Sequence, residues 1–265
     1  MKDISYQELK QIQLDILQFV HDFCQFHHIN YSLAYGTLLG AVRHGGYIPW
    51  DDDIDIAMMR DDYERFAKAF NLEVSPYHFY DCRNDENVHI AFGKVADTRT
   101  LVEEGASTKN LGVAIDIFPI DDLCDTYEES KKYYNSYSFA KNLLVLKCRD
   151  IADVRSWWKK PIFAIVKLLS CWYPLHQISL KMNEKAMSHK KNESNYVGLL
   201  VDGYENEIME RNIWSEYCQI SFEGRTFCSV KNYDSYLKHA YGDYMQLPPE
   251  KDRVPKHDFY KMYWL

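Results

Sequence analysis

Apolar residues recur every three or four positions through residues 6–27, which is the spacing of an amphipathic helix. A capping box precedes them, with Ser5 at the N-cap and Glu8 three residues later. The pattern predicts one long helix over this range, packed by its apolar stripe. Asn30 is expected to end it, and residues 31–35 are predicted to form a short strand that leads into a Gly-Thr turn.

Two later segments alternate polar with apolar residues, as strands with one buried face do. Residues 53–58 read D-I-D-I-A-M and residues 113–118 read V-A-I-D-I-F, with Pro119 expected to end the second strand. Because alternate side chains share one face, Asp53 and Asp55 are predicted to point the same way while their isoleucine neighbours enter a core.

The remaining pattern mixes strands and helices, with helices dominating after residue 125. Helices are predicted over residues 38–44, 61–70, 128–149, 157–172, 175–191 and 232–241, strands over 77–82, 89–95, 100–103 and 196–201, and a hairpin over 219–230. This order predicts an α/β (α+β) fold. We expect residues 1–125 to form a mixed sheet flanked by helices, and residues 126–265 to add a helical elaboration and a C-terminal block within one compact unit.

Composition narrows the class of protein. The 265 residues are 46% apolar and 26% charged, which suits a globular protein with a substantial core. A net charge of −8 argues against a nucleic-acid partner. Seven cysteines without a C-x-x-C pair indicate neither a zinc site nor a disulfide framework. Residues 1–10 lack the apolar core of a signal peptide, so we expect a reducing, cytoplasmic location.

The segment 157–172 is strongly apolar but too short to span a bilayer, and Lys167 interrupts it. Arg155, Lys159 and Lys160 accompany its tryptophans. Two interpretations remain open, a core helix that lines a cleft and a helix that lies on a membrane surface. The 21 tyrosines likewise suit either an aromatic-rich core and surface or a site for cations or sugars.

The densest chemistry lies in residues 36–56, which read G-T-L-L-G-A-V-R-H-G-G-Y-I-P-W-D-D-D-I-D-I. Two carboxylates on one buried strand repel each other and require a cation, and hard oxygen ligands suit Mg²⁺ or Mn²⁺. Asp116 lies in the middle of an apolar strand. It becomes a third candidate ligand if that strand lies beside the strand of Asp53 and Asp55.

Other interpretations of the acidic residues are weaker. An EF-hand is excluded because Ile56 stands where its glycine is needed and Asp62 where its glutamate is needed. A solvated acidic turn does not explain why Ile54 and Ile56 alternate with the acids. Asp121 and Asp122 follow the expected strand end and are predicted to be solvated.

Several residues are candidates for binding phosphate. Gly36 and Thr37 open a predicted helix, where backbone N–H groups bind anions and glycine permits close approach. Arg43 and His44 leave that helix toward the same loop and are within reach of phosphate oxygens. Lys94 lies on a predicted strand and is interpreted either as a phosphate clamp or as a solvated edge residue.

These residues resemble the LicD family of phosphocholine transferases, which belongs to the nucleotidyltransferase-fold superfamily and is related to the fukutin group. The resemblance rests on the block 36–56, on I-D-I-F-P-I-D-D from Ile115 and on Y-G-D-Y-M-Q-L-P-P from Tyr241. It covers nearly the whole chain, and the middle helical region is the part least matched.

The resemblance implies a nucleotidyltransferase-like sheet and a specific set of site residues. Asp53, Asp55 and Asp116 are implied to be catalytic and to hold Mg²⁺ or Mn²⁺, while Gly36 and Thr37 seat a phosphate. The remaining implied substrate-binding residues are Arg43, His44, Trp50, Lys94, Thr100, Arg253 and His257. Lys94 and Thr100 belong to the block K-V-A-D-T-R-T, and Trp50, with Trp157, Trp158 and Trp172 as alternatives, is a candidate for enclosing choline.

The activity that the resemblance implies is transfer of phosphocholine from CDP-choline to a sugar hydroxyl of a cell-surface glycan, of the teichoic acid or lipopolysaccharide type, with release of CMP. Asp116 is implied to take the proton of the acceptor. A lipid-linked acceptor and peripheral contact with the inner membrane face are expected. A nucleotidyltransferase that moves NMP from an NTP to a small hydroxylated substrate uses the same acids and remains the alternative. A non-catalytic binding module is disfavoured because the acid set is complete.

Overall fold

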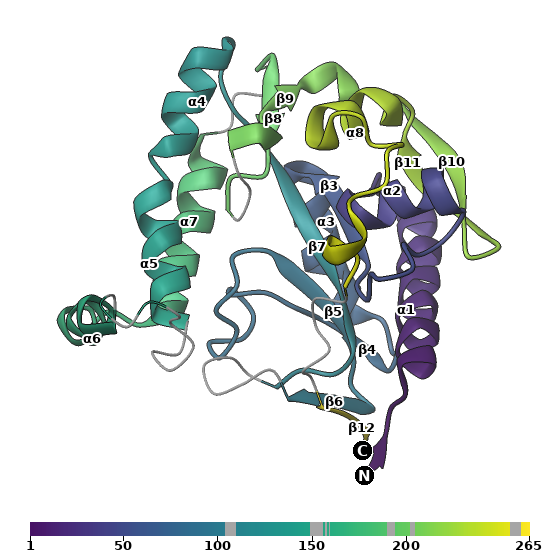
Figure 1. Ribbon diagram of the computed structural model, residues 1–265, viewed down its shortest axis with the longest axis horizontal. Helices are drawn as coiled ribbons and strands as arrows, with labels where there is room; N and C mark the ends of the chain where they lie inside the picture. Colours follow the sequence, from purple (N-terminus) through teal and green to yellow (C-terminus); the bar gives the residue numbers. More distant parts are fainter. Residues whose placement is uncertain are drawn as a thin grey trace.

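The computed structural model describes residues 1–103, 110–148, 156, 158, 160–189, 194–201, 205–254 and 261–265 (Figure 1). Predicted residues outside these ranges include Arg155, Trp157, Lys159 and His257. Among the described helices, none combines the length and the hydropathy needed to cross a bilayer.

A mixed sheet forms the centre of the fold, as the α/β (α+β) prediction required. Its strands lie in the order β2-β3-β7-β5-β4, with β3 and β7 parallel and the other pairs antiparallel. Two further strands, β8 and β9, extend the sheet from the end of β7. The strands are β2 Ser32–Leu33, β3 Asp55–Met59, β4 Tyr77–Tyr80, β5 Gly93–Asp97, β7 Ala114–Asp122, β8 Tyr196–Gly198 and β9 Met209–Glu210.

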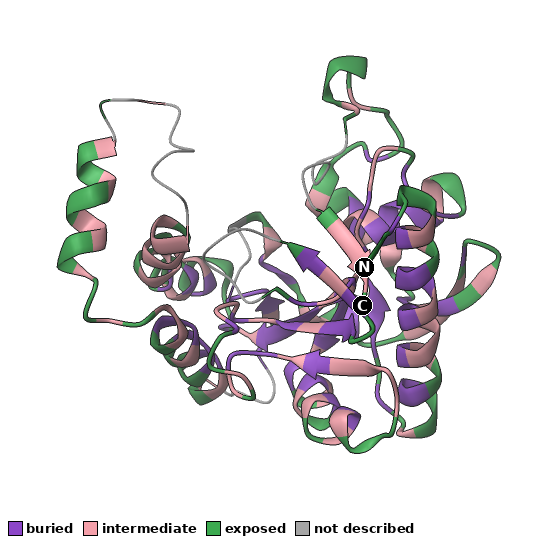
Figure 2. Cartoon of the chain, turned by 90° about the horizontal axis from the view of Figure 1, so that it is seen from below, coloured by how far each residue is buried: buried purple, intermediate pink, exposed green. Residues whose placement is uncertain are grey.

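Three helices of the N-terminal half pack around this sheet. Helix α1, Tyr6–Phe26, begins at the predicted capping box and packs against β5 and β7. Its apolar stripe is buried, and Figure 2 shows this stripe on the side of α1 that faces the sheet. Helix α2, Tyr35–His44, contacts β3, and α3, Arg60–Ala69, contacts β3 and β7. The core therefore lies between α1, α3 and the central strands.

Helices dominate the next segment, but the predicted helix over 128–149 is two helices. They are α4, Tyr127–Asn135, and α5, Ser138–Cys148. The break lies at Ser136, whose hydroxyl donates a 2.6 Å hydrogen bond to the carbonyl of Tyr133 and so competes with helix continuation. Helices α6, Lys160–Leu169, and α7, Leu175–Ser188, follow, and Figure 1 shows α4, α5 and α7 side by side with α6 apart from them.

The C-terminal part closes the fold over the first helices. Strands β10, Tyr217–Phe222, and β11, Arg225–Val230, form the predicted hairpin around Glu223 and Gly224, which both have positive φ. Helix α8 spans Tyr233–Tyr241. Short 3₁₀ turns are η1 Phe70–Leu72, η3 Glu205–Glu207, η4 Arg211–Trp214 and η5 Glu250–Asp252.

One small sheet was not predicted. Strand β12, Lys261–Trp264, lies between β1, Lys2–Asp3, and β6, Thr100–Glu103, and pairs antiparallel with both. The two termini therefore lie side by side (Figure 1). Strands this short carry too few residues for alternation to reveal them.

The expectation that Pro119 ends its strand is wrong. Strand β7 continues through it to Asp122, and Pro119 pairs in register with Met58. The Asp116 N–H donates to the carbonyl of Ile54, which directly precedes β3, so the Pro119 nitrogen, three residues on, faces the opposite side of β7. On that side the pairing with β5 has already ended at Ile117, so the missing N–H leaves no hydrogen bond unmade.

Candidate functional site

Three neighbouring strands carry the central side chains of the site in one row. Asp55 on β3 pairs in register with Asp116 on β7, and Asp116 pairs in register with Lys94 on β5. Directly paired residues project from the same face of a sheet. The strands of Asp55 and Asp116 are thus neighbours, which was the condition for Asp116 to approach the other acids. Lys94 Nζ lies 2.6 Å from Asp116 Oδ1.

The opposite face of the same strands is buried. Ile56 and Ile117 are fully buried, and so is Val95 on β5. The alternation in the sequence therefore sorts apolar side chains into the core and charged ones onto the site face. Asp55, Asp116 and Lys94 are each half-buried.

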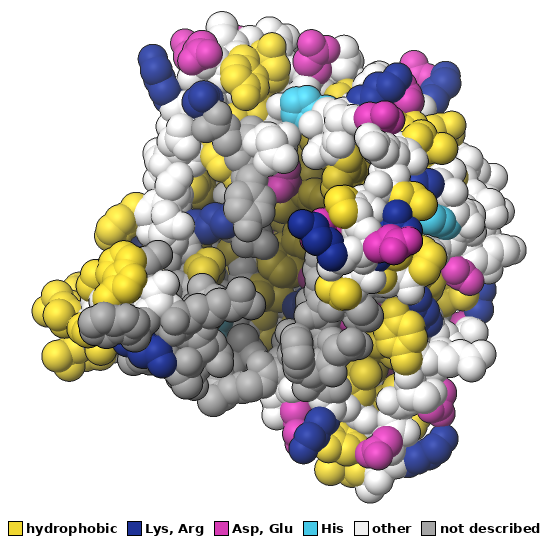
Figure 3. All heavy atoms as spheres, viewed as in Figure 1, with side chains coloured by type: hydrophobic (Ala, Val, Ile, Leu, Met, Phe, Trp, Pro, Cys, Tyr) yellow, Lys and Arg dark blue, Asp and Glu magenta, His cyan; other side chains and the backbone are white. Residues whose placement is uncertain are grey.

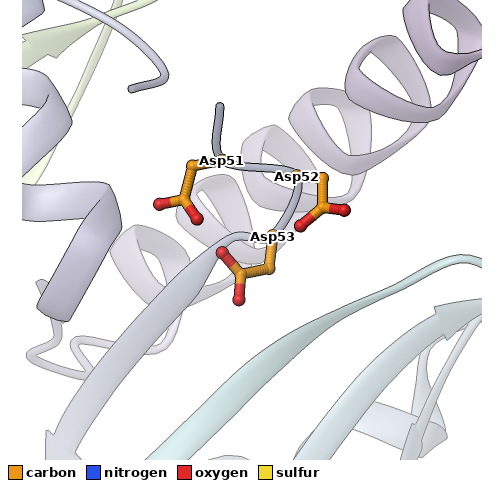
Figure 4. A group of neighbouring side chains, drawn as sticks. All are labelled: Asp51, Asp52 and Asp53. Atoms are coloured by element: carbon orange, nitrogen blue, oxygen red, sulfur yellow. The ribbon is translucent and has the colours of Figure 1, made fainter. Parts of the chain in front are cut away.

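Three more aspartates lie in the loop that leads into β3. Oxygen atoms of Asp51, Asp52 and Asp53 come within 4.8 Å of one another (Figure 4). The prediction that the strand starts at Asp53 is wrong, since β3 starts at Asp55 and Asp53 belongs to the loop. The loop precedes the part of β3 that pairs with β2, namely Ile56 and Ala57.

The carboxylates interact strongly. Burial raises the pKa of Asp55 well above its ordinary value, and the neighbouring carboxylates of Asp53, Asp116 and Asp51 raise it further. The ammonium of Lys94 acts in the opposite direction. Like charges held this close favour either a bound proton or an added cation.

The donor set fits Mg²⁺ or Mn²⁺. The aspartates of the row and the loop offer carboxylate oxygens, which are hard ligands. Oxygens of three of them lie close enough together to contact one ion. Among the described residues, the group that meets this spacing is Asp51, Asp52 and Asp53 rather than the predicted Asp53, Asp55 and Asp116. The assignment of individual ligands stays a prediction.

Gly36 and Thr37 were expected just before a helix over residues 38–44, but the helix starts three residues earlier than predicted. Helix α2 starts at Tyr35, so both residues belong to its first turn. A Cβ on Gly36 would lie 2.4 Å from Asp51 Oδ2, so only glycine lets this carboxylate approach the helix start. Thr37 is buried, and its Oγ1 accepts a 2.8 Å hydrogen bond from the Asp55 N–H. Thr37 therefore ties helix α2 to the first residue of β3.

A cavity of about 460 Å³ lies beyond the other end of α2, and its lining includes Arg43, Trp50, Tyr241 and one carboxylate, Asp243. Arg43 donates to His44 Nε2 at 3.0 Å and to the carbonyl of Tyr244 at 2.9 Å.

The guanidinium carbon of Arg253 lies 5.7 Å from the centre of the Trp50 ring, beside this cavity. Burial lowers the pKa of Arg43, and the nearby charge of Arg253 lowers it further. Within the described part of the chain, neither guanidinium forms an ion pair. Two arginines without a carboxylate partner are suited to bind an anion.

A second cavity, of about 180 Å³, adjoins the row of charged residues. Asp53, Lys94 and Asp116 contribute to its lining, together with Gln13 and Gly112. The loop that leads into β3 supplies Trp50 to the first cavity and Asp53 to the second. The acidic loop therefore lies between the two cavities.

Thr100 has a structural environment. Its buried hydroxyl donates to the carbonyl of Asp97 and accepts from the N–H of Val113, both at 2.8 Å. These bonds use the hydroxyl to hold the turn between β5 and β6. The role of Thr100 in substrate binding stays a prediction, and His257 lies outside the described residues.

Two residues near the acids were not predicted as part of the site. Tyr241 lines the first cavity, and burial raises the pKa of its hydroxyl, with smaller contributions from the carboxylates of Asp55, Asp51 and Asp53. Tyr35 has a left-handed backbone, with φ of 46°, and its hydroxyl donates a 2.6 Å hydrogen bond to Glu207. The Gly-Thr turn drew attention to the sequence next to Tyr35, but no sequence pattern indicated Glu207 as its partner.

The prediction of solvated side chains at Asp121 and Asp122 is wrong. Asp121 is 1% exposed and receives two hydrogen bonds from the guanidinium of Arg60, at 2.6 and 3.0 Å. Asp122 forms an ion pair with Arg211. Because β7 runs on past Pro119, both residues lie inside the sheet and not beyond its end.

Sequence comparisons relate this chain to a known family and to known proteins over different lengths. Residues 28–152 match the family described as LicD/FKTN/FKRP, nucleotidyltransferase domain. The chain is 29% identical to the lipopolysaccharide cholinephosphotransferase LicD of Haemophilus influenzae, across 97% of each chain. Shorter matches are to an uncharacterised protein of Rickettsia typhi, 40% identical over 26% of this chain and 22% of that protein, and to one of Rickettsia prowazekii, 47% identical over 18% of each.

Proposed function

This chain belongs to the LicD family, and on that premise we propose that it transfers phosphocholine from CDP-choline to a sugar hydroxyl of a cell-surface glycan, with release of CMP. The observation that carries the proposal is the row of Asp55, Asp116 and Lys94 beside the acidic loop, with the cavity that Arg43 and Trp50 line on the other side of this loop. Lipopolysaccharide is the acceptor class favoured by the name of the full-length relative, and a teichoic acid offers the same type of hydroxyl.

Asp53 and Asp55, with Asp51 or Asp116 completing the set, would hold Mg²⁺ or Mn²⁺. When bound, the ion neutralises negative charge on the diphosphate oxygens of the donor. Gly36 and Thr37 contribute by fixing the loop and the start of β3 against helix α2.

Two arginines would bind the nucleotide side of the donor. Arg43 and Arg253 carry charges that no carboxylate of the described chain neutralises. Trp50 and Tyr241 present rings in the same cavity, of about 460 Å³. Phosphate oxygens on the guanidinium groups and a base on an aromatic ring match this lining.

Aromatic rings near the acids offer a surface for the quaternary ammonium. The ring of Phe118 lies 5.3 Å from that of Tyr35 and 4.6 Å from that of Phe92, measured between centres. Phe118 projects from the same face of β7 as Asp116, two residues earlier. Cation–π attraction to these rings, with the Glu207 carboxylate beside Tyr35, would favour choline over an uncharged headgroup.

The acceptor hydroxyl requires a group that takes its proton. We assign this step to Asp116 Oδ2, because Lys94 binds the other oxygen of the same carboxylate and fixes its orientation. The proton then leaves the acceptor oxygen as this oxygen bonds to phosphorus, and CMP departs with the electrons of the broken phosphate bond. We place the reaction at the cytoplasmic membrane face, on a lipid-linked glycan.

The alternative function uses the same acids. A nucleotidyltransferase would bind an NTP in the cavity that Arg43 and Trp50 line, transfer NMP and release pyrophosphate. The product released therefore distinguishes the two reactions.

The test is to incubate the protein with Mg²⁺, a lipopolysaccharide or teichoic acid precursor and CDP-choline, CDP-ethanolamine or a CDP-polyol, and to measure CMP. We expect CMP from CDP-choline in the presence of acceptor, its loss in Asp53→Ala and Asp116→Asn, and its retention in Asp3→Asn, a change at an exposed aspartate on β1. CMP from another CDP donor would change the headgroup. Pyrophosphate from an NTP panel, without CMP release from any CDP donor, would replace the proposal by the alternative.

A further inference from the structure

Helix α6 stands away from the body of the protein. None of its residues, Lys160–Leu169, is buried. Figures 1 and 2 show it apart from the α4, α5 and α7 group, and the helix that it packs against is α5. An apolar helix that has no buried residue among the described parts of the chain is unusual in a globular protein.

The exposed side chains of α6 are large and apolar. Four of them form the α6 apolar face, namely Ile162, Ile165, Leu168 and Leu169, with exposed fractions of 52%, 56%, 70% and 68%. Their spacing of three, four and seven residues places them on one side of a helix. Trp158 precedes the helix and Trp172 follows it, and both are exposed. Figure 3 shows hydrophobic side chains gathered at this edge of the molecule, with dark blue side chains next to them.

Every charged residue between Asp153 and Glu184 in the sequence is a lysine or an arginine. Residues 154–183 contain five lysines and arginines and no aspartate or glutamate, although the whole chain has a net charge of −8. The acidic character of the protein is thus confined to other regions. A basic, apolar segment complements a surface that is anionic outside and apolar inside.

Contacts with α5 fix the orientation of the helix end. Lys147 of α5 donates hydrogen bonds to the carbonyls of Ser170 and Tyr173, at 2.5 and 2.6 Å. The indole N–H of Trp172 donates to the carbonyl of Leu169 at 2.7 Å. The carbonyl groups at and after the last turn are therefore satisfied from within the protein, and the residues that follow α6 are linked to α5.

We propose that the α6 apolar face docks onto the surface of a membrane that contains anionic lipid. The helix would lie in the plane of the interface, with Ile165 and Leu168 among the acyl chains. Lys160 and Lys167, on the opposite, half-buried side of the helix, would add positive charge that attracts the segment to an anionic surface. Tryptophans at both ends match the interfacial position that this side chain prefers. A helix of 10 residues, about 15 Å long, lies on a bilayer and does not cross it.

This inference goes beyond the proposed transfer reaction, because α6 contributes no residue to the acidic row or to the two cavities described with it. Binding to lipid is therefore measurable without any substrate. If the transfer reaction is also correct, docking would bring a lipid-linked glycan to the enzyme.

The experiment is sedimentation of the full-length protein with vesicles of phosphatidylcholine alone or mixed with phosphatidylglycerol. We expect binding to the mixed vesicles, weakened by salt, and at least about tenfold weaker binding for the double variant Ile165→Asp, Leu168→Asp. Leu72→Asp is the matched control, since Leu72 is also exposed, at 81%, but lies on η1 and away from the basic segment. Thermal unfolding and CMP release with a water-soluble acceptor check that each variant is folded.

Two outcomes would overturn the proposal. One is equal sedimentation of the wild type, the double variant and the Leu72→Asp control with mixed vesicles. The other is a dimer in light scattering that the double variant disrupts, without lipid binding by the wild type, which would assign the α6 apolar face to a second copy of the chain. Charge reversal by Lys160→Glu and Lys167→Glu tests the electrostatic part separately, and unchanged binding would refute it.

Discussion

The Nζ atom of Lys94 lies 2.6 Å from Oδ1 of Asp116, and the two residues are register partners on adjacent strands. Asp116 has a second register partner in Asp55 on its other side. A lysine thus stands at one end of a row of carboxylates. Lys94 brings a positive charge to this group of acids. The neighbouring acids raise the pKa of Asp55, and Lys94 acts in the opposite direction.

Lys94→Met tests whether this charge stabilises the fold. Removing the ammonium leaves the half-buried Asp116 without its ion-pair partner, and we expect a loss of about 1–2 kcal/mol in the free energy of unfolding when EDTA is present. Mg²⁺ should raise the melting temperature of the variant by more than that of the wild type, because the carboxylates then lack an internal cation. Thermal unfolding with and without Mg²⁺ measures both effects.

Lys231→Met is the matched control for that experiment. Lys231 pairs with Glu216, and both side chains are about two-thirds exposed, so the loss of the pair should have little effect. Equal Mg²⁺-induced shifts in the wild type and Lys94→Met would show that Lys94 does not substitute for the metal's charge.

Asp55→Asn is expected to stabilise the protein at neutral pH while abolishing CMP release. Burial and neighbouring carboxylates raise the pKa of Asp55 in the folded state, so the folded protein binds this proton more tightly than the unfolded chain. Stability is therefore lost as the pH rises from the ordinary carboxyl pKa through the raised one. The asparagine variant lacks this loss.

Melting temperatures in EDTA between about pH 4 and pH 8 measure the effect. The advantage of Asp55→Asn over the wild type should be largest at high pH and shrink toward the ordinary carboxyl pKa. Asp3→Asn, on the exposed β1, should show no such trend. The contradicting outcome is a variant that is less stable than the wild type at every pH. It would mean that favourable interactions of the Asp55 carboxylate outweigh the cost of its burial and of repulsion by the neighbouring acids.

The sequence predicted the acidic row because a local pattern encodes it. Asp55 and Asp116 each stand between buried isoleucines, and alternation of that kind specifies both the strand and the face. The sequence did not establish that the strands of Asp55 and Asp116 are neighbours, so their convergence was stated as a condition. Lys94 was recognised as a candidate, but its ion pair with Asp116 was not, since side-chain partners across a sheet leave no mark in one sequence.

Tertiary contacts account for what the sequence did not reveal. Asp121 was expected to be solvated because a proline precedes it, and only the pairing of β7 beyond Pro119 makes the position internal. The gathering of Arg43, Trp50 and Arg253 joins residues about 200 positions apart. The small strand β12 is likewise defined by its partners β1 and β6 and not by its own residues.

Thr37→Val tests how the first residue of β3 is positioned. The variant removes the acceptor of the Asp55 N–H in a buried place, which should lower the free energy of unfolding by about 1–3 kcal/mol. Displacement of Asp55 should also reduce kcat for CMP release, by up to about 100-fold. Denaturant unfolding and steady-state kinetics provide the two measurements.

Thr37→Ser is the control, because serine keeps the hydroxyl and removes one methyl group. It should retain most of the activity that Thr37→Val loses. A serine variant with a lower kcat than the valine variant would indicate that the methyl group, and not the hydrogen bond to Asp55, explains the threonine.

Arg60→Met should destabilise the protein strongly without changing the residues of the acidic row. Arg60 and Asp121 are 5% and 1% exposed, and two hydrogen bonds join them while Asn183 accepts a third from the same guanidinium at 3.1 Å. Removal of the cation leaves Asp121 charged and buried, which should lower the free energy of unfolding by about 3–5 kcal/mol.

The double variant Arg60→Met, Asp121→Leu removes both charges and should recover a large part of this loss. Urea unfolding of the three proteins, with Arg225→Ala as an exposed-pair control expected to lose at most about 1 kcal/mol, separates the two effects. If the double variant is as unstable as Arg60→Met, the loss comes from packing at Arg60 and not from the unpaired charge of Asp121.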